Sequence, residues 1–548
     1  MNAEVAPKEA PKGGIVPCTR RVMNLAHVLR QAARRFPHAI GFVQGDFTLT
    51  WGAIDARVDA MAAALAAHGL GKGDRVLVQS KNCLQMFESM FACFRLGAVW
   101  VPTNFRQTPG EVAYLAQASG AVAMICHADF PAHVTAAQAA APGITTVIAI
   151  GAAPFGPDYE ALVAAHLGTA VRTADVERDD PCWFFFTSGT TGRPKAAVLT
   201  HGQMGFVITN HLCDLMPGTT QADASLVVAP LSHGAGIHQL VQTARAAKTI
   251  LLSTERLDVE EAWRTVERWK VTNIFTVPTI TKMLAEHPAA DQFDHSSLRY
   301  VIYAGAPMYR ADQKRALARL GKVLVQYFGL GEVTGNITVL PPALHDLEDG
   351  PGTRIGTCGF ERTGIIVQIQ NDAGQEVAPF ETGEICVAGL AVFAGYYNNP
   401  EANEKAFRNG WFRTGDLGHM DGEGFLFITG RASDMYISGG SNVYPREVEE
   451  KVLQHPDVAE VAILGVPDPM WGEVGVAVCV PRDGASLEEA DLLAFLDGKV
   501  SRYKMPKRVF VWDALPKSAY GKITKKMVRE ALEARGCLPL ARAPEAAS

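Results

Sequence analysis

The sequence lacks the features of a secreted, membrane-spanning or nucleic-acid-binding protein. Its ten cysteines are scattered, without a C-x-x-C pair or zinc-site spacing, so we expect reduced, mostly buried thiols. No run of 18 apolar residues occurs, because the candidate Met90–Val101 is interrupted by Arg95, and no transmembrane segment is expected. Residues 1–21 lack the apolar centre of a secretory signal, which favours a cytoplasmic location.

The charge balance also lacks a basic surplus. The chain has 51 Lys and Arg against 57 Asp and Glu, for a net charge of −6, and we expect no nucleic-acid partner. Hydrophobic residues make up 48% and charged residues 20% of the 548 residues, an ordinary globular composition. This length suggests about two to four folding units.

Short apolar runs alternate with helical patterns over most of the chain. Runs such as Arg75–Gln79 and Asn273–Val277 are bounded by turn residues, which favours an α/β fold with a largely parallel, buried sheet. After Gly350, strand patterns follow one another without long helices. We therefore expect a large N-terminal α/β domain with layered sheets and a β-rich subdomain, then a small, mobile α+β C-terminal domain.

The domain boundary is expected near Gly430–Asp434. This places a flexible tail at 1–20, the N-terminal domain at 21–430, the C-terminal domain at 431–536 and a second tail at 537–548. Chain ends rich in small and polar residues are often poorly ordered.

The most informative segment is an apolar strand that runs directly into a Gly/Ser/Thr-rich loop, TSGTTGRPK at 187–195. Glycines let backbone N–H groups surround an anion, and hydroxyl groups and basic side chains add donors and charge. This composition suits a polyphosphate. The loop is not a Walker A motif, because Pro194 stands five residues after Gly189.

This loop resembles the phosphate-binding signature of the adenylate-forming (AMP-binding) superfamily, and within it the acyl- and aryl-CoA synthetases of the fatty acid–CoA ligase and 4-coumarate–CoA ligase type. Further motifs of that family follow in the same order: PLSH at 230–233, GAP at 305–307, YFGLGE at 327–332, WFRTGD at 411–416, GR at 430–431, SGGSN at 438–442 and PKSAYGK at 516–522.

The resemblance implies an AMP-forming acid–thiol ligase. A carboxylate attacks the α-phosphate of ATP to give acyl-AMP and pyrophosphate, and the thiol of coenzyme A then takes the acyl group. The partners implied are a small carboxylic acid, ATP, Mg²⁺ and coenzyme A. Homodimers occur in the family, and the sequence leaves the assembly state open.

The matched positions imply specific roles. Lys522 would lie between the two anions that approach each other during adenylation, and it would offset their repulsion. Glu332 would bind Mg²⁺ together with Thr187, because oxygen ligands suit a hard cation. His233 would border the reacting carboxylate. The expected nucleotide and coenzyme A ligands are Thr187, Ser188, Gly189, Thr190, Thr191, Gly192, Lys195, Gly305, Ala306, Pro307, Phe328, Gly329, Asp416, Arg431, Gly439 and Gly440.

Two positions depart from the family pattern. Gly331 stands where the family usually has Thr or Ser before the metal-binding glutamate, and the expectation is that water or Thr334 replaces the missing hydroxyl. Ser433 stands where the hinge is usually Asp or Lys. Neither change indicates an inactive enzyme.

The segments expected to line the acid pocket are 233–238, 303–306 and 329–337. They contain several glycines and alanines and neither Arg nor Lys. The pocket is therefore expected to be sizeable and apolar, and to take an aromatic or medium-to-long-chain monocarboxylic acid.

Three alternatives remain open. The chain could load the acid onto a carrier protein, act as an adenylation domain of a peptide synthetase, or bind nucleotide without turnover. Retention of Glu332 and Lys522 argues against the last alternative.

Overall fold

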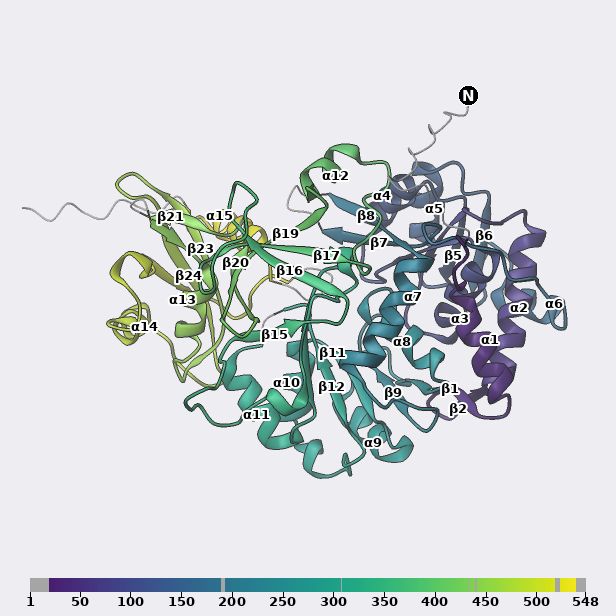
Figure 1. Ribbon diagram of the computed structural model, residues 1–548, viewed down its shortest axis with the longest axis horizontal. Helices are drawn as coiled ribbons and strands as arrows, with labels where there is room; N and C mark the ends of the chain where they lie inside the picture. The colour runs from purple at the N-terminus through teal and green to yellow at the C-terminus, as the bar shows by residue number, and fades with distance from the viewer. Residues whose placement is uncertain are drawn as a thin grey trace, which may run out of the picture.

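The computed structural model describes residues 19–188, 193–306, 308–431, 433–438, 441–517 and 523–538. The described chain forms two large sheets and one small sheet (Figure 1). The N-terminal part holds both large sheets, and the C-terminal part lies at one end of the molecule.

One large sheet has six strands in the order β6-β5-β3-β4-β7-β8. All neighbouring strands are parallel except β7 and β8, which form an antiparallel hairpin. Both strands of the hairpin carry residues of the glycine-rich segment, Thr187 and Ser188 at the end of β7 and Pro194 and Lys195 at the start of β8. The strands are β3 (Arg75–Gln79), β4 (Val99–Thr103), β5 (Ala123–His127), β6 (Thr146–Ile150), β7 (Pro181–Ser188) and β8 (Pro194–Thr200).

The second large sheet has 14 strands. Its half formed by β1, β10, β9, β11, β12 and β13 is parallel, whereas β14 to β20 pair antiparallel. The strands are β1 (Ile40–Gln44), β2 (Phe47–Thr50), β9 (Ala224–Val227), β10 (Lys248–Leu251), β11 (Asn273–Thr276), β12 (Tyr300–Tyr303), β13 (Leu324–Phe328), β14 (Thr338–Leu340), β15 (Thr357–Glu361), β16 (Ile365–Gln370), β17 (Gly383–Gly389), β18 (Phe407–Arg408), β19 (Trp411–Met420) and β20 (Phe425–Arg431).

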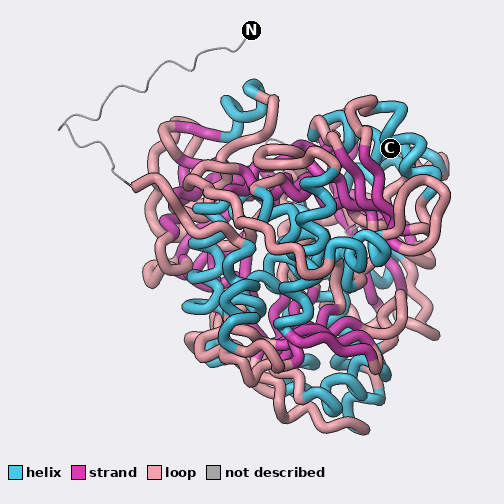
Figure 2. The backbone as a smooth tube through the Cα atoms, turned by 90° about the vertical axis from the view of Figure 1, so that its right-hand side faces the viewer, coloured by secondary structure: helices cyan, strands magenta, loops and turns pink. Residues whose placement is uncertain are grey.

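Helices pack between the two large sheets and on their outer faces. One continuous core joins the inner helices to both sheets, and in the turned view these helices lie between two groups of strands (Figure 2). The inner helices are α1 (Ala26–Arg35), α2 (Trp51–Ala67), α3 (Leu84–Leu96), α7 (His201–Asn210) and α8 (Gly234–Ala244). Separate cores form under the outer helices, which are α4 (Pro109–Ser119), α5 (Pro131–Ala140), α9 (Val259–Trp269), α10 (Pro278–Glu286) and α11 (Arg310–Leu320). Two further helices are α6 (Tyr159–His166) and α12 (Pro400–Ala406).

The C-terminal part has its own five-stranded sheet with a core on each face. Both cores consist of residues from 436–538. The elements are β21 (Tyr436–Ser438), β22 (Ser441–Val443), α13 (Pro445–Val452), β23 (Val458–Asp468), β24 (Gly472–Pro481), α14 (Glu489–Leu496), β25 (Arg508–Val511) and α15 (Lys525–Ala534).

The fold class expected from the sequence is confirmed, with two differences in detail. The β-rich segment after Gly350 is not detached: β15 pairs with β14 and continues the second large sheet. Arg95, which interrupts the apolar run, lies fully buried in α3 and forms ion pairs with Asp55 and Asp59 of α2. A paired charge therefore stabilises the packing of two inner helices.

None of the described helices is both long enough and apolar enough to cross a membrane.

Candidate active site

The strand β7 brings Thr187 to the metal-binding residue expected from the sequence. The Thr187 hydroxyl donates a hydrogen bond to Oε1 of Glu332 over 2.7 Å. Glu332 lies in a 3₁₀ turn, Gly331–Val333, three residues after β13 ends, and is 5% exposed. Thr187 pairs with Lys195 across the β7–β8 hairpin. The structure thus joins the glycine-rich loop to the carboxylate.

Tyr396 also contacts Glu332, and the sequence analysis did not identify this tyrosine. Thr187, Glu332, Tyr396 and Lys195 together are called the Glu332 corner below. The Tyr396 hydroxyl donates to the same Oε1 of Glu332 over 2.9 Å, and the Tyr396 ring centroid lies 4.6 Å from Nζ of Lys195. Burial and the neighbouring carboxylate raise the pKa of Tyr396, so the phenol stays protonated and acts as a donor. The signal in the sequence was two tyrosines in a Gly-Tyr-Tyr-Asn-Asn-Pro turn at 395–400.

These residues suit Mg²⁺ that arrives with a nucleotide. A carboxylate and a hydroxyl supply oxygen ligands, which a hard cation prefers. Within the described ranges, no group of three or more His, Cys, Asp or Glu side chains could hold a metal ion alone. Glu332 would hold the ion, with phosphate oxygens as further ligands.

Gly331 is explained by its neighbours. A Cβ atom at this position would lie 2.6 Å from Cδ1 of Phe185 and 2.8 Å from Cγ2 of Thr187. Such distances exclude a side chain without movement of these residues. The Phe185 ring therefore takes space that the family usually gives to a Thr or Ser at position 331.

Thr334 does not supply the hydroxyl that Gly331 lacks, contrary to the sequence-based expectation. It is buried, its hydroxyl donates to O of Val333 over 2.6 Å, and it accepts from Nδ2 of Asn336 over 2.9 Å. Both bonds turn the hydroxyl toward its own loop.

His233 precedes α8 and lies beside Phe185, with a distance of 5.4 Å between ring centroids. Its Nδ1 lies 2.8 Å from Oγ of Ser232. Phe185 thus contacts both the glycine before Glu332 and the histidine expected at the carboxylate. The phosphate and acid sides of the expected site lie on either side of this ring.

Asp416 and Arg431 face each other on β19 and β20. The Nε atom of Arg431 donates to Oδ1 of Asp416 over 2.9 Å, and Asp416 is buried while Arg431 is half exposed. The structure therefore places together two of the residues that the resemblance assigns to ligand binding.

Several of the expected nucleotide ligands follow two parallel, adjacent strands. Gly305 and Ala306 are exposed after β12, and Phe328 is half-buried at the end of β13. The carboxyl ends of neighbouring parallel strands share one edge of the sheet, where ligands of open α/β sheets bind. Gly329 packs tightly, because a Cβ there would lie 2.4 Å from the Gly335 backbone.

The remaining expected site residues lie outside the described residues. They are Gly189, Thr190, Thr191, Gly192, Pro307, Gly439, Gly440 and Lys522, together with the side chain of Ser188.

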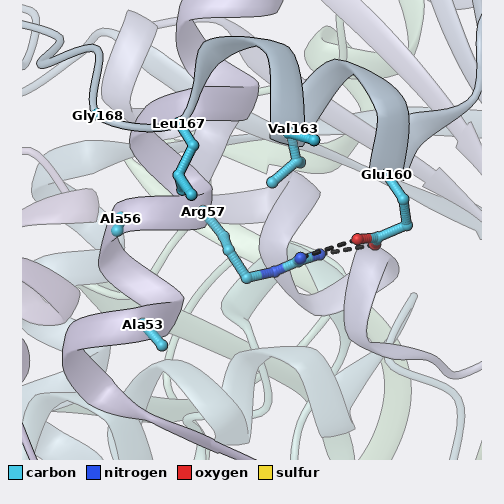
Figure 3. Close-up of a pocket in the computed structure, with 8 residues that line it drawn as sticks. Ala53, Ala56, Arg57, Glu160, Val163, Leu167 and Gly168 are labelled. Carbon is cyan, nitrogen blue, oxygen red and sulfur yellow. Dashed lines mark hydrogen bonds and ion pairs between the residues drawn. The ribbon is translucent and has the colours of Figure 1, made fainter.

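A separate hollow of 570 Å³ lies between α2 and α6 (Figure 3). Arg57 lines it and forms ion pairs with Glu160, over 2.7 Å, and with the buried Glu88, over 2.6 Å. Its lining contains none of the residues that the sequence assigned to the site. This hollow is therefore separate from the residues expected to line the acid pocket.

Comparison with known proteins identifies the family. The AMP-binding enzyme family matches residues 29–397, and the AMP-binding enzyme C-terminal domain matches residues 447–522. A feruloyl-CoA synthase of Amycolatopsis sp is 37% identical over 498 residues, covering 91% of this chain and 96% of that protein. An indoleacetate–CoA ligase of Aromatoleum aromaticum is 34% identical over 493 residues, covering 90% of this chain and 94% of that protein.

Solved structures agree with the sequence comparison. ATP-bound MatB from Rhodopseudomonas palustris superimposes with a TM-score of 0.82 at 29% identity, covering 93% of this chain and 99% of that chain. The chain therefore belongs to the AMP-binding enzyme family, and its expected reaction class, AMP-forming ligation of a carboxylic acid to coenzyme A with ATP and Mg²⁺, is confirmed.

Proposed function

We propose that the protein activates an aromatic or medium-to-long-chain monocarboxylic acid and transfers it to coenzyme A through the residues described above. The observation that carries this proposal is the corner in which Thr187 and Tyr396 both donate to Glu332 beneath Lys195. This arrangement holds one carboxylate at the start of the glycine-rich loop, where a nucleotide-bound Mg²⁺ needs it.

In the first half-reaction, residues 187–195 hold the β- and γ-phosphates. Asp416 binds the ribose hydroxyls, with Arg431 beside it, and Phe328 stacks on adenine opposite the Gly305–Pro307 segment. Mg²⁺, when bound, offsets negative charge on the phosphates. Lys522 offsets the repulsion between the carboxylate and the α-phosphate as they meet. The carboxylate oxygen then bonds to phosphorus and pyrophosphate leaves.

In the second half-reaction, residues 431–536 rotate so that the Gly439–Gly440 loop lines the path of coenzyme A. Separate cores on the C-terminal sheet support this motion, since this part packs on its own residues. Ser433, beside the exposed Arg431, serves as the hinge. The thiol attacks the acyl carbon, and AMP leaves.

The nature of the acid is inferred from the expected pocket segments and from the relatives. Segments 233–238, 303–306 and 329–337 contain neither Arg nor Lys that could pair with a second carboxylate. Contrary to the sequence-based expectation, Gly234 and Gly331 do not themselves open space, because a Cβ there would lie 2.7 Å from Cζ of Phe275 and 2.6 Å from Cδ1 of Phe185. The two relatives described above act on feruloyl and indoleacetate groups by name, which favours an aromatic monocarboxylate for this chain.

The test is ATP- and coenzyme-A-dependent AMP formation with acetate, butyrate, octanoate, palmitate, benzoate, cinnamates and malonate. We expect turnover with an aromatic or longer-chain acid, and a loss of about 10²–10³-fold in the adenylation rate for Lys522→Ala. Lys526→Ala is the control, because Lys526 is exposed and lies 3.9 Å from Glu530. Turnover of malonate alone would contradict the acid class.

Pyrophosphate release without consumption of coenzyme A would instead identify loading of a carrier protein. A cytoplasmic location and a homodimer stay predictions, which cell fractionation and sedimentation velocity would check.

A further inference from the structure

Asn82 links the two large sheets through a pair of hydrogen bonds. It stands three residues after the end of β3 in the six-stranded sheet, in the loop that leads into α3. Its amide contacts the loop that follows β9 of the 14-stranded sheet. Nδ2 donates to O of Ala229 over 2.9 Å, and the N–H of Leu231 donates to Oδ1 over 2.8 Å. One side chain therefore pairs two backbone groups of a loop that belongs to the other sheet.

The two bonded backbone groups lie on either side of Pro230. Proline has no N–H group, so this part of the loop cannot form the regular ladder of a β-strand. Ala229 and Leu231 are both buried, and buried backbone groups are costly to leave unpaired. A primary amide carries a donor and an acceptor side by side, which is what this loop requires.

The same loop ends at His233, the residue expected beside the reacting carboxylate. The N–H of His233 donates to O of Pro230 over 3.1 Å. His233 is the N-cap of α8, which begins at the next residue, and its ring lies against Phe185. Because a single turn joins Pro230 to His233, a displacement of Pro230 would move the imidazole as well.

Lys81, the residue before Asn82, offers a comparison within the same loop. Its Nζ forms ion pairs with Asp129, which follows β5, and with Glu255, which follows β10. Lys81 therefore bridges the same two sheets as Asn82, but these ion pairs do not involve residues 229–233. Both carboxylates are largely exposed, and exposed ion pairs contribute little to stability.

We propose that Asn82 is a positioning residue for the acid side of the site: its two hydrogen bonds hold the 229–233 loop and thereby place the His233 imidazole beside the acid that reacts. The inference rests on the proposed function, which assigns His233 to that side. It adds a second contact between the sheets at the site, since Thr187 of the six-stranded sheet holds Glu332 on the phosphate side.

The experiment is a double-mutant cycle between Asn82 and His233. Pyrophosphate formation is measured with the acid that gives the highest turnover in the panel above, and kcat/KM for the acid and KM for ATP are determined. Asn82→Ala removes both bonds, so it should reduce kcat/KM for the acid about 10-fold, whereas KM for ATP should change less than about 2-fold. In a His233→Ala background, Asn82→Ala should change kcat/KM less than about 2-fold, because the side chain that it positions is already absent.

Lys81→Met is the matched control, because it removes a link between the same sheets without touching the 229–233 loop. It should leave both kinetic values within about 2-fold. Asn82→Asp, a second variant, keeps the size of the side chain but places an oxygen against O of Ala229, and it should show the same dependence on His233. Thermal unfolding midpoints show which variants are folded, and the cycle is read from a folded one.

Equal losses from the Asn82 variants with and without His233 would overturn the inference, as would an unchanged kcat/KM for the acid. An equally large loss in Lys81→Met, or unfolding of both Asn82 variants, would show a role in the whole fold and would overturn it too. Full activity of His233→Ala would leave Asn82 nothing to position, with the same consequence. The absence of AMP formation with every acid in the unmodified enzyme would instead overturn the proposed function, so the two failures are distinguishable.

Discussion

The site has a phosphate side around Glu332 and an acid side around His233, both near the C-terminal end of β13. The two sides differ in how completely their buried polar groups are hydrogen-bonded. On the phosphate side, Glu332 accepts bonds from both Thr187 and Tyr396. On the acid side, Nε of Arg362 and Nδ1 of His238 are buried and have no hydrogen-bond partner among the described residues. The hydrogen bonds to Glu332 hold its carboxylate in place before substrate binds, whereas the unpaired polar groups on the acid side can still form hydrogen bonds with a bound molecule. The paired side serves the adenylation step, which is the same for every acid, whereas the unpaired side contacts the acid itself.

The largest effect is expected from a side chain added at Gly331, which lies against Phe185 between the phosphate side and the acid side. Gly331→Thr forces the new side chain against Phe185 and Thr187, and overpacking of this kind costs about 1–3 kcal/mol of unfolding free energy. Urea unfolding and the pyrophosphate-release rate measure the effect, and both should fall.

The same prediction has a matched rescue and a control. Phe185→Leu should recover part of the loss when combined with Gly331→Thr, since the ring is what occupies the space. Gly350→Thr should cost little, because nothing lies within 4 Å of a Cβ there. Failure of Phe185→Leu to compensate would contradict the pairing of these two positions.

A second change tests the phosphate side alone. Tyr396→Phe removes one of the bonds to Glu332 but keeps the ring near Lys195. We expect kcat/KM for pyrophosphate formation to fall about 10-fold, which corresponds to about 1.4 kcal/mol, together with a higher Mg²⁺ requirement.

Tyr397→Phe is the neighbouring control, because the Tyr397 ring packs on Phe184 with centroids 4.7 Å apart. An unchanged Mg²⁺ titration in Tyr396→Phe would remove Tyr396 from the metal site.

The smallest effect concerns pH on the acid side. Burial lowers the pKa of His238 to about 4, against about 6.5 in an unfolded chain. The unfolded state therefore binds more protons between these values, and unfolding free energy falls as pH drops from about 6.5 to 4, by at most about 1.4 kcal/mol per pH unit for this group.

Urea unfolding at pH 7, 6 and 5 measures this slope. His211 has a lowered pKa as well, through burial and the charge of Arg362, and adds to the slope. His238→Gln should reduce it, and an identical slope in that variant would show that His238 does not contribute.

The sequence predicted much of the phosphate side and little of the acid side. Thr187, Glu332 and Lys195 belong to motifs in which a hydroxyl, a carboxylate and an ammonium group indicate phosphate and metal binding. Tyr396 was missed because its role depends on a contact with Glu332, 64 residues away. Arg362 was missed because it lies outside the segments expected to line the pocket, and only the packing of its loop places it beside Gly335.

The sequence by itself determined the family, the reaction class and the order of helices and strands, because local patterns and motif spacing carry that information. Tertiary structure decided that Gly331 makes room for Phe185, that Thr334 bonds to its own loop, and that Asn82 bonds to the backbone on both sides of Pro230. These facts depend on distances between segments far apart in the chain. No local pattern specifies such distances, since they arise only when the sheets and inner helices pack together.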